Sequence, residues 1–315
     1  MKIKEKIDSL LISKYDQYVN TKTLQAFVAV AEEGHFGKAA ERLGITQSGL
    51  SQIVKNLETT VGGRLIDRTT RSVSLTDVGQ AFLENARELL QAHRVAEEKM
   101  ANVVRGEEGT VRLGFVASAA LGIVPRLAAL AHEHAPGLRL SLTEVTSEDQ
   151  IPQLRSGEID VGVMREIQQF PGLVIVPLET EPLLVAVPDT HRLADHESVS
   201  IAELRDEGFI MFPRTRVSYL HDLIHQLCHR AGFTPVITER AVQFATILGL
   251  VSSNAGIAIV PQAITAIRLP NVTFVPIQDD DAISRIYIAR RADDKAAPAA
   301  VRLVTLATGN TSNKG

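Results

Sequence analysis

The sequence is poor in cysteine and aromatic residues and has no tryptophan. Cys228 is the one cysteine among 315 residues, so no disulfide can form within the chain. Aromatic residues make up 4% of the sequence, which argues against binding of single-stranded nucleic acid by base stacking. No apolar run approaches the roughly 18 residues of a membrane-spanning helix, and no secretory signal is recognisable. We therefore expect a soluble, cytoplasmic protein with no membrane partner.

The sequence also lacks the motifs of common catalytic sites. Ser118 does not lie in a nucleophile-elbow sequence, and there is no glycine-rich phosphate loop. His221, His225 and His229 recur every four residues near Cys228, a spacing that can bind a metal. The apolar positions of the same predicted helix place these histidines off its buried face, which favours solvated side chains. We expect no enzymatic activity, no cofactor and no metal.

The length and composition predict more than one globular domain. A chain of 315 residues with 45% hydrophobic residues can bury a large core and suggests two or more domains. The formal net charge is −4, so the chain as a whole is not a basic, non-specific nucleic-acid binder. No internal repeat or low-complexity segment is present.

Residues 47–58, QSGLSQIVKNLE, form the most informative segment. Apolar residues at positions 50, 53, 54 and 57 give one apolar face, which predicts a helix. The rest of its surface carries polar side chains that can bond base edges and phosphates: Gln47, Ser48, Ser51, Gln52 and Lys55. Thr46 is a candidate N-cap, and helices are expected over residues 24–33 and 36–43. The pattern indicates the recognition helix of a helix-turn-helix, although a small helical bundle without a DNA role remains an alternative.

A basic hairpin is expected directly after this helix. Residues 64–75 alternate apolar and polar side chains, which predicts two short strands. Arg64, Arg68 and Arg71 could clamp a phosphate backbone or enter a minor groove. A solvated charged loop is the other interpretation. Residues 21–75 hold seven basic and five acidic side chains, a modest net charge of +2 that favours specific binding by a dimer.

A long helix is expected from Thr76 to about Val104. Residues of one face step alternately by four and three positions over about three heptads, which predicts a coiled-coil seam. The seam consists of Phe82, Ala86, Leu89, His93, Ala96, Met100 and Val103, of which His93 is the polar member. A seam needs a partner, so we expect a homodimer, with packing on its own domain as the alternative. Gly106 and Gly109 end the helix and mark a domain boundary.

Apolar strands alternate with helices from Thr110 onward, which predicts parallel α/β sheets. Ligands bind beyond the carboxyl ends of strands in such sheets. Ser118, Thr146, Ser147 and Arg165 each follow a predicted strand. Ser118 and Ser147 are candidate caps of the following helices, and Ser147 begins a capping-box pattern. Two helix N-termini and an arginine would suit a carboxylate.

The segments FVAVAEEGHFGKAAERLGITQSGLSQIVKNLE and RLIDRTTRSVSLTDVG resemble the N-terminal domain of LysR-type transcriptional regulators. Ser48 and Gly49 stand where the family often has Pro and Ala, and Gln52 stands where a basic residue is common. The resemblance implies sequence-specific binding of double-stranded DNA, a homodimer through the linker helix and a homotetramer, with RNA polymerase as a further partner. A solute-binding protein or an architectural DNA binder would share only one half of this pattern.

The resemblance also implies a mixed α+β and α/β fold. The expected parts are an N-terminal extension (1–20), a winged helix-turn-helix domain (21–78), a dimerising linker helix (79–106), a periplasmic-binding-protein-like effector domain (109–305) and a flexible tail (306–315). Two α/β subdomains are expected in the effector domain, subdomain I at about 109–181 and 283–305, and subdomain II at about 182–282. The chain should cross between them near residues 181–182 and 279–283.

The spacing of GFVAS, EVTSEDQ and GVMRE is similar to the branch of the family that senses muconate and other products of aromatic catabolism. The similarity places Ser118, Ser147 and Arg165 on ligand-contact positions and implies a small carboxylate effector between the subdomains. In FPRTRVSYL the aromatic residue of that branch is replaced by Leu220, with Tyr219 beside it. Arg214 and Arg216 could add positive charge at the cleft, although solvated side chains are the favoured interpretation. The effector, the operator, the direction of regulation and the role of residues 1–20 are not determined by the sequence.

Overall fold

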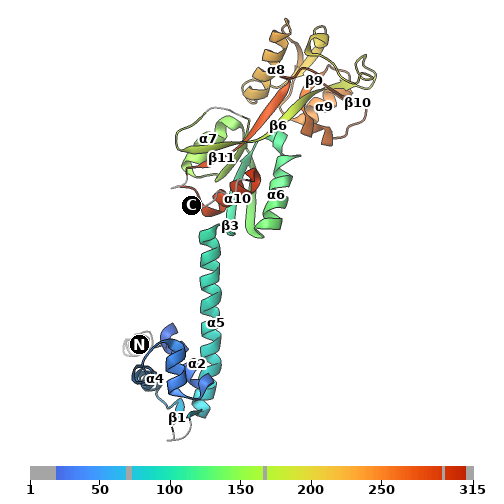
Figure 1. Ribbon diagram of the computed structural model, residues 1–315. Coiled ribbons are helices and arrows are strands. Elements are labelled where there is room, and N and C mark those ends of the chain that lie inside the picture. The colour runs from blue at the N-terminus through green and yellow to red at the C-terminus, as the bar shows by residue number, and fades with distance from the viewer. Residues whose placement is uncertain (1–18, 69–72, 166–168, 293–294, 310–315) are drawn as a thin grey trace, which may run out of the picture. The chain divides into compact units, whose positions relative to one another are not determined.

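The structure, a computed structural model, describes residues 19–68, 73–165, 169–292 and 295–309 (Figure 1). The expected N-terminal extension up to residue 18, Arg71 and residues 310–315 lie outside the described part. Contacts divide the chain into two compact units, Met1–Ala101 and Asn102–Gly315, which are described separately. Within the described residues, no helix is long and apolar enough to cross a membrane.

The first unit is a winged helix-turn-helix. Its helices are α2 (Thr21–Glu33), α3 (Phe36–Leu43) and α4 (Gln47–Val61), and its wing consists of β1 (Ile66–Arg68) and β2 (Val73–Leu75). The N-terminal part of α5 (Asp77–Arg105) completes it. The two strands pair antiparallel, with Ile66 opposite Leu75. The expected recognition helix is thus confirmed and continues about one turn beyond Glu58.

Local sequence sets the ends of these short helices. Asn20, His35 and Thr46 cap α2, α3 and α4 by accepting backbone N–H bonds through their side chains, as N-cap residues do. Gly44 ends α3 with φ at 66°, a left-handed conformation that favours glycine. This turn aims α4 away from α3 and creates the helix-turn-helix.

Aromatic and aliphatic side chains from every element fill the core of the first unit. Phe27 and Leu50 are fully buried, and the ring of Phe27 meets that of Phe82 edge-on at 5.2 Å. Gly79 lets α5 approach the wing, because a Cβ there would lie 1.9 Å from the carbonyl oxygen of Leu65. The wing and the long helix are therefore fixed to the same core.

Helix α5 leaves most of its predicted seam uncovered in a single chain. Leu89 is 55% exposed, Met100 63% and Val103 43%, whereas the seam residues near the DNA-binding core, such as Ala86, are buried. Exposed apolar side chains at heptad spacing over a 29-residue helix are typical of a surface that a partner helix covers.

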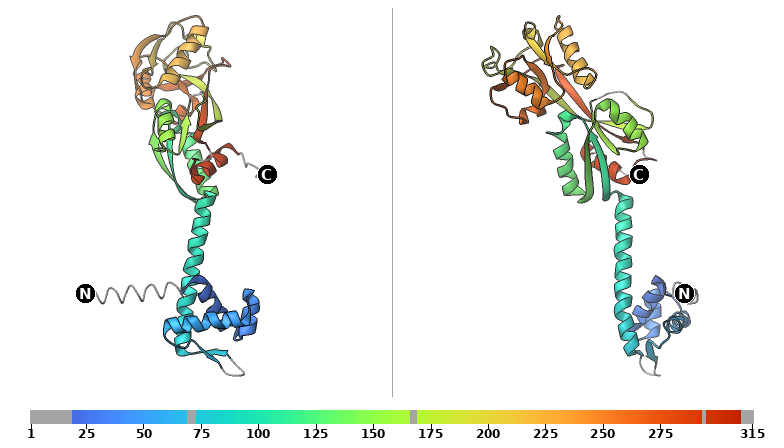
Figure 2. Two further views of the ribbon diagram at one scale, coloured as in Figure 1. Left: turned by 90° about the vertical axis from the view of Figure 1, so that its left-hand side faces the viewer. Right: turned by 180° about the vertical axis from the view of Figure 1, so that it is seen from behind.

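The second unit is built on a mixed sheet, in which β4, β3 and β5 run parallel and β11 and β6 are antiparallel to their neighbours. The strands of its first half, subdomain I, are β3 (Glu108–Phe115), β4 (Gly137–Glu144), β5 (Val161–Met164), β11 (Ile283–Arg291) and the start of β6 (Leu173–Pro188). Helices α6 (Ile123–His134) and α10 (Pro298–Thr308) lie together beside β3 (Figures 1 and 2), and α7 (Ser147–Ser156) belongs to a separate core with β5.

Subdomain II surrounds the far end of β6. There β6 pairs with β9 (Ala258–Pro261) and β10 (Val272–Pro276), and β7 (Gly208–Met211) pairs in parallel with β8 (Val236–Arg240). Helices α8 (Ser218–Arg230) and α9 (Phe244–Ser252) pack on these strands in one core. The chain crosses between subdomains within β6, where Pro182 pairs with Ile283, and again just before β11.

Several expectations about element ends and direction need correction. The sheets are not uniformly parallel, since β6, β9, β10 and β11 form antiparallel pairs. Thr146, not Ser147, caps α7. Ser118 lies in the 3-10 turn Ala117–Ala119, and α6 begins only at Ile123 without a side-chain cap. Residues 306–308 belong to α10 rather than to a tail.

Candidate functional site

The exposed face of α4 carries most of the side chains predicted to contact DNA. Leu50, Val54 and Leu57 are buried on its other face. Among the predicted set, Gln47, Ser48, Gln52 and Lys55 are exposed and Ser51 is half-buried. The Gln52 amide donates to Asn56 Oδ1 at 2.8 Å, which orients one of these polar groups along the helix. Helix α4 thus has one polar, exposed face and one apolar face that is packed in the core.

The wing is held by two side chains of its neighbours. Glu58 Oε1 accepts hydrogen bonds from the backbone N–H groups of Leu65 and Ile66 at 2.9 and 3.1 Å. Thr76 Oγ1 donates to the Arg64 carbonyl at 2.7 Å. Arg64 is exposed, while the side chains of Arg68 and Arg71 lie outside the described part of the chain.

Ion pairs tie the helices of this domain together behind the recognition surface. Glu32 of α2 binds Arg42 of α3 and Arg87 of α5, each at 3.0 Å. The hydrogen bond from Arg87 is the main cause that lowers the pKa of Glu32. These pairs are partly exposed, so water screens each of them and the contribution of each to stability is small. Together they cross-link three helices.

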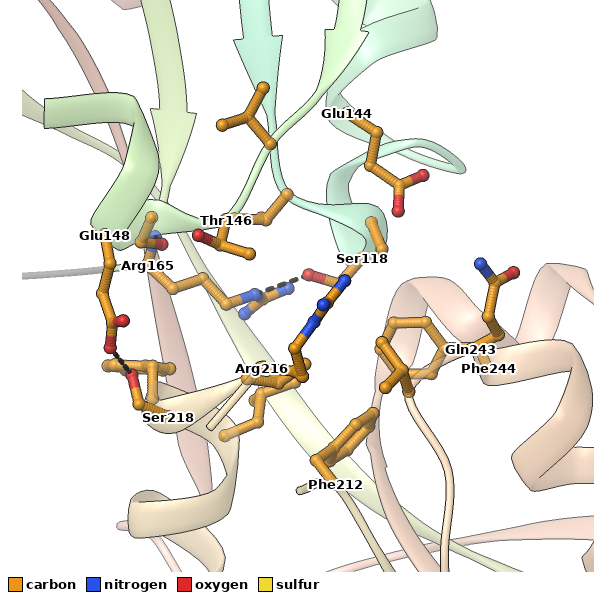
Figure 3. Close-up of a pocket in the computed structure, with 18 residues that line it drawn as sticks. Ser118, Glu144, Thr146, Glu148, Arg165, Phe212, Arg216, Ser218, Gln243 and Phe244 are labelled. Atoms are coloured by element: carbon orange, nitrogen blue, oxygen red, sulfur yellow. Dashed lines mark hydrogen bonds between the residues drawn. The ribbon is translucent and has the colours of Figure 1, made fainter. Parts of the chain in front are cut away.

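A cavity of about 210 Å³ lies between the two subdomains of the second unit (Figure 3). Subdomain I contributes the 3-10 turn after β3, the N-terminus of α7 and the end of β5, and subdomain II contributes the segments before α8 and α9. All six residues predicted to bind the effector line this cavity: Ser118, Thr146, Ser147, Arg165, Tyr219 and Leu220. The structure therefore brings the predicted residues together, and direct ligand contact by each of them stays a prediction.

Arg165 is bound on all sides by protein groups. It is 2% exposed; its Nε donates to Ser118 Oγ and its Nη2 to Glu181 Oε2, both at 2.7 Å. Its Nη1 donates to the hydroxyl of Ser284, and its backbone N–H donates to Ser147 Oγ at 3.1 Å. The positive charge of Arg165 is thus matched by a buried carboxylate and is not free to attract an anion.

The same network links the two subdomains. Glu181 lies in the crossing part of β6 and is 5% exposed. Its other oxygen, Oε1, accepts from the backbone N–H of Ala263 in subdomain II at 2.6 Å. Nearer the mouth, Ser218 at the start of α8 donates to Glu148 at the start of α7 (Figure 3). A change in the angle between the subdomains must rearrange these bonds.

The sequence analysis missed several residues that line the cavity. Glu144, Phe212, Gln243 and Phe244 were not selected, and Arg216 was expected to be solvated, but all five line it. Arg214, by contrast, forms a bidentate pair with Asp222 at 2.8 and 3.1 Å and does not line it. The signal that could have found Glu144 and Gln243 is position, since Glu144 is the last residue of β4 and Gln243 directly precedes α9.

The three histidines lie on α8, and His221 and His225 are half-buried rather than solvated as expected, whereas His229 is exposed. Among the described residues, no group of three or more potential ligands could hold a metal ion. His221 Nδ1 lies 3.0 Å from Asp222 Oδ1, and hydrogen bonding, mainly from Arg214, lowers the pKa of Asp222 to about 2. Burial raises the pKa of the Cys228 thiol to about 12, so the thiolate that redox chemistry requires is scarce.

Comparison with known proteins gives matches along nearly the whole chain. Residues 21–80 match the bacterial regulatory helix-turn-helix protein family, lysR type, and residues 104–311 match the LysR substrate binding domain. YnfL of Escherichia coli, an uncharacterised HTH-type transcriptional regulator, is 36% identical over 90% of this chain and 95% of its own. AlsR of Bacillus subtilis, an HTH-type transcriptional regulator, is 36% identical over 86% of this chain and 90% of its own.

Solved structures of similar proteins agree with this assignment. CbnR, a LysR family transcriptional regulator, matches with a TM-score of 0.81 at 29% identity, covering 92% of this chain and 100% of its own. Full-length CbnR complexed with its target DNA matches with a TM-score of 0.77 at 29% identity over 92% and 98%. The effector binding domain of BenM with its effector benzoate matches at 0.56 and 30% identity, covering 65% of this chain and 95% of its own.

Proposed function

This chain belongs to the LysR family of transcriptional regulators, and from that premise we propose how its two sites work together. The chain is a regulator, not an enzyme, with a DNA-binding helix-turn-helix and an effector-binding domain. The proposal is that a small carboxylate effector occupies the 210 Å³ cavity and that its binding changes the affinity for operator DNA. The convergence of all six predicted side chains on this one cavity is the observation that carries it.

The size and composition of the cavity favour a small ligand. Its volume lies below the roughly 300–1,000 Å³ that is typical of pockets for drug-sized ligands. Apolar side chains such as Val116 and Leu220 lie beside polar ones, a mixture that is typical of specific sites for small molecules. The BenM effector domain was solved with benzoate, which supports a carboxylate and the aromatic-catabolism branch for this chain.

The regulatory step follows from the bonds between the subdomains. An effector that prefers one arrangement of the subdomains shifts the population toward it by its differential affinity. The Ala263–Glu181 and Ser218–Glu148 hydrogen bonds both span the junction, so a change in the angle between the subdomains would break or remake them. The changed arrangement would then reposition the DNA-binding domains.

The proposed assembly is a homodimer through α5 that forms a homotetramer, with RNA polymerase as a further partner. The exposed seam of α5 supports the dimer, since an apolar stripe of this length is rarely left in water. Met100→Lys should shift the sedimentation coefficient toward a smaller species, because a charge would be buried at the seam. Glu98→Lys, off the seam, is the control, and an unchanged coefficient for Met100→Lys would remove α5 from the interface.

Fluorescence anisotropy with duplex DNA tests the effector role. The full-length protein is titrated onto DNA from upstream of its own gene and onto a random duplex, with and without benzoate or cis,cis-muconate. We expect specific binding that a carboxylate shifts by about 5- to 150-fold, the usual size of allosteric coupling. Binding of a carboxylate without any change in operator affinity would separate the pocket from regulation.

A further inference from the structure

The two walls of the cavity carry opposite charge. On the side of subdomain I, Glu144 and Glu148 are acidic, and the charge of Arg165 is already matched by Glu181. On the side of subdomain II, Arg216 is the charged side chain among the described lining residues. The lining is therefore negative on one wall and positive on the other, with a net formal charge of −1 once the Arg165–Glu181 pair is set aside.

Most of the hydroxyl groups at the cavity are already engaged within the protein. Ser118 and Ser147 accept from Arg165, and Thr146 bonds the first turn of α7. By contrast, the side chains of Glu144, Arg216 and Gln243 have no hydrogen-bond or ion-pair partner among the described residues. Figure 3 shows Glu144 and Arg216 both pointing into the cavity. These three side chains are exposed and can bond a ligand directly. The hydroxyls of Ser118 and Ser147 act only as acceptors toward Arg165, so each also keeps an O–H donor for a ligand.

Two helix N-termini on the wall of subdomain II also lack side-chain caps. Val217 precedes the 13-residue α8 and Gln243 precedes the 9-residue α9, and neither gives a capping hydrogen bond. Their first backbone N–H groups can therefore donate to an anion, which the helix dipole favours. Helix α7 on the opposite wall is capped by Thr146 and has acidic residues in its first turn, so an anion is disfavoured there.

An aromatic corner adjoins the positive wall. The rings of Phe212 and Phe244 meet edge-on, with centroids 5.3 Å apart and planes at 70°. Val242 beside them is 39% exposed and lines the cavity. Burial of an apolar group against this corner would be favourable, because it removes apolar surface from water.

We propose that the effector is a small zwitterion, an α-amino acid with an apolar side chain. Its carboxylate binds Arg216 and the N-termini of α8 and α9, its ammonium group binds Glu144, and its side chain packs on Phe212 and Phe244. This inference rests on the proposed effector function and names its ligand class. The cavity of about 210 Å³ is smaller than pockets for drug-sized ligands, which are roughly 300–1,000 Å³, and this suits a small molecule such as an amino acid.

A zwitterion would also join the two walls. Its ends would bind opposite subdomains, so closure of the cleft would strengthen both charge-assisted contacts together. A simple carboxylate would satisfy the positive wall alone and would leave Glu144 without a partner. A dianion would bring a second negative charge toward Glu144 and Glu148.

Matched ligands test the proposal on the full-length protein by calorimetry and thermal shift. The twenty amino acids are screened first, with benzoate and cis,cis-muconate beside them. L-leucine is then compared with 4-methylpentanoate and 3-methylbutylamine, and L-phenylalanine with 3-phenylpropanoate and 2-phenylethylamine. We expect an amino acid to bind. Removal of either its ammonium group or its carboxylate group should weaken binding by about 10- to 100-fold, as for a lost hydrogen bond to a charged group.

Two variants assign the charges to their walls. Glu144→Gln should weaken binding of the amino acid by about 10-fold or more and leave binding of its des-amino analogue unchanged. Arg216→Ala should weaken binding of both compounds. Glu197→Gln and Arg268→Ala remove exposed charges outside the cavity and are the controls. Equal binding of amino acid and des-amino acid, or an effect of Glu144→Gln on both alike, would overturn the zwitterion.

The outcomes separate this inference from the proposed function. If benzoate or muconate binds and changes operator affinity while amino acids do not bind, the zwitterion is wrong and the effector function stands. If an amino acid binds through Glu144 and operator affinity does not change, the ligand class is right and the regulatory role fails. If none of the compounds binds, the zwitterion is rejected, and so is a carboxylate of the kinds tested.

Discussion

Removal of the Arg165 guanidinium should strongly destabilise the effector domain, because the Glu181 carboxylate would remain buried without its partner. The two side chains are 3% and 6% exposed, and the Nη2 to Oε2 distance is 2.7 Å. Loss of one partner from a buried ion pair costs about 3–5 kcal/mol. Arg165→Met, which keeps an unbranched apolar stem, should lower the free energy of unfolding of this domain by about that amount.

A double-variant cycle isolates the pair from other effects. Arg165→Met combined with Glu181→Gln should recover much of the loss, since replacement of a whole buried pair by neutral groups is often near neutral. Arg126 and Glu179 form a control pair at 2.6 Å, with side chains 51% and 37% exposed. Its disruption should cost less than about 1 kcal/mol, because water screens exposed charges.

Urea unfolding followed by circular dichroism measures these free energies. The transition of the effector domain should move to lower urea with an unchanged slope. A loss below about 1 kcal/mol for Arg165→Met, or strictly additive single variants, would show that the charges are not buried and coupled. A lost effector response in Arg165→Ala would also follow from this loosened junction, so it is not by itself a test of ligand contact.

Three further predictions concern other parts of the chain. Gln47→Ala should weaken binding to operator DNA by about 5- to 150-fold, the size of a lost base contact, and should change binding to a random duplex little. Gln25→Ala on α2 is the control. Equal losses of affinity for both duplexes would assign Gln47 a structural role. Cys228 should react with a thiol reagent at pH 8 only after unfolding, because burial raises its pKa to about 12; rapid labelling of the native protein would contradict this. Burial raises the pKa of Asp160, but hydrogen bonds from Arg112 outweigh burial and hold the pKa in the folded state below 3.8. The carboxylate therefore stabilises the fold above about pH 3.8, and this stabilisation is lost as the pH falls through the folded-state pKa. Asp160→Asn should therefore lower stability at neutral pH and flatten its acid dependence, and an unchanged acid profile would exclude this role.

Local sequence was sufficient for the helix-turn-helix, because each of its signals acts within a few residues. The apolar spacing of α4, the Thr46 cap and the turn at Gly44 all operate inside one or two helical turns. The position of the wing depends instead on Glu58, whose carboxylate reaches backbone seven and eight residues away. No periodic pattern predicts a bond of that kind.

The antiparallel part of the sheet was missed for a physical reason. Strand β6 contains three prolines within 16 residues, among them Pro177 and Pro182, and proline is normally excluded from central strands. The structure accommodates Pro177 beside an irregularity in register opposite Ile286 and Tyr287, where a ladder bond is interrupted in any case. A tertiary feature thus overrides the local signal.

The candidate site shows which residues a sequence pattern can rank. Topology alone brought Ser118, Ser147 and Arg165 to one edge, because the carboxyl ends of parallel strands meet there. Whether these side chains bind a ligand or other protein groups depends on distances that only the fold fixes. The Arg165 guanidinium donates its hydrogen bonds to Ser118, Ser284 and Glu181. Thr146 and Ser147 are both good caps, and local sequence does not decide between neighbours.

The residues that hold the junction between the subdomains differ from the side chains that are available to a ligand. A residue that holds the junction between subdomains is needed whichever ligand binds, so its identity carries little information about ligand chemistry. Three side chains at the cavity have no partner within the part of the chain that the structure describes. They are Glu144 at the end of β4, Arg216 shortly before α8 and Gln243 directly before α9. Substitutions there would change charge and hydrogen bonding at the cavity without breaking the buried Arg165 network. The chemical class of the ligand therefore depends on these three side chains more than on Ser118, Ser147 and Arg165.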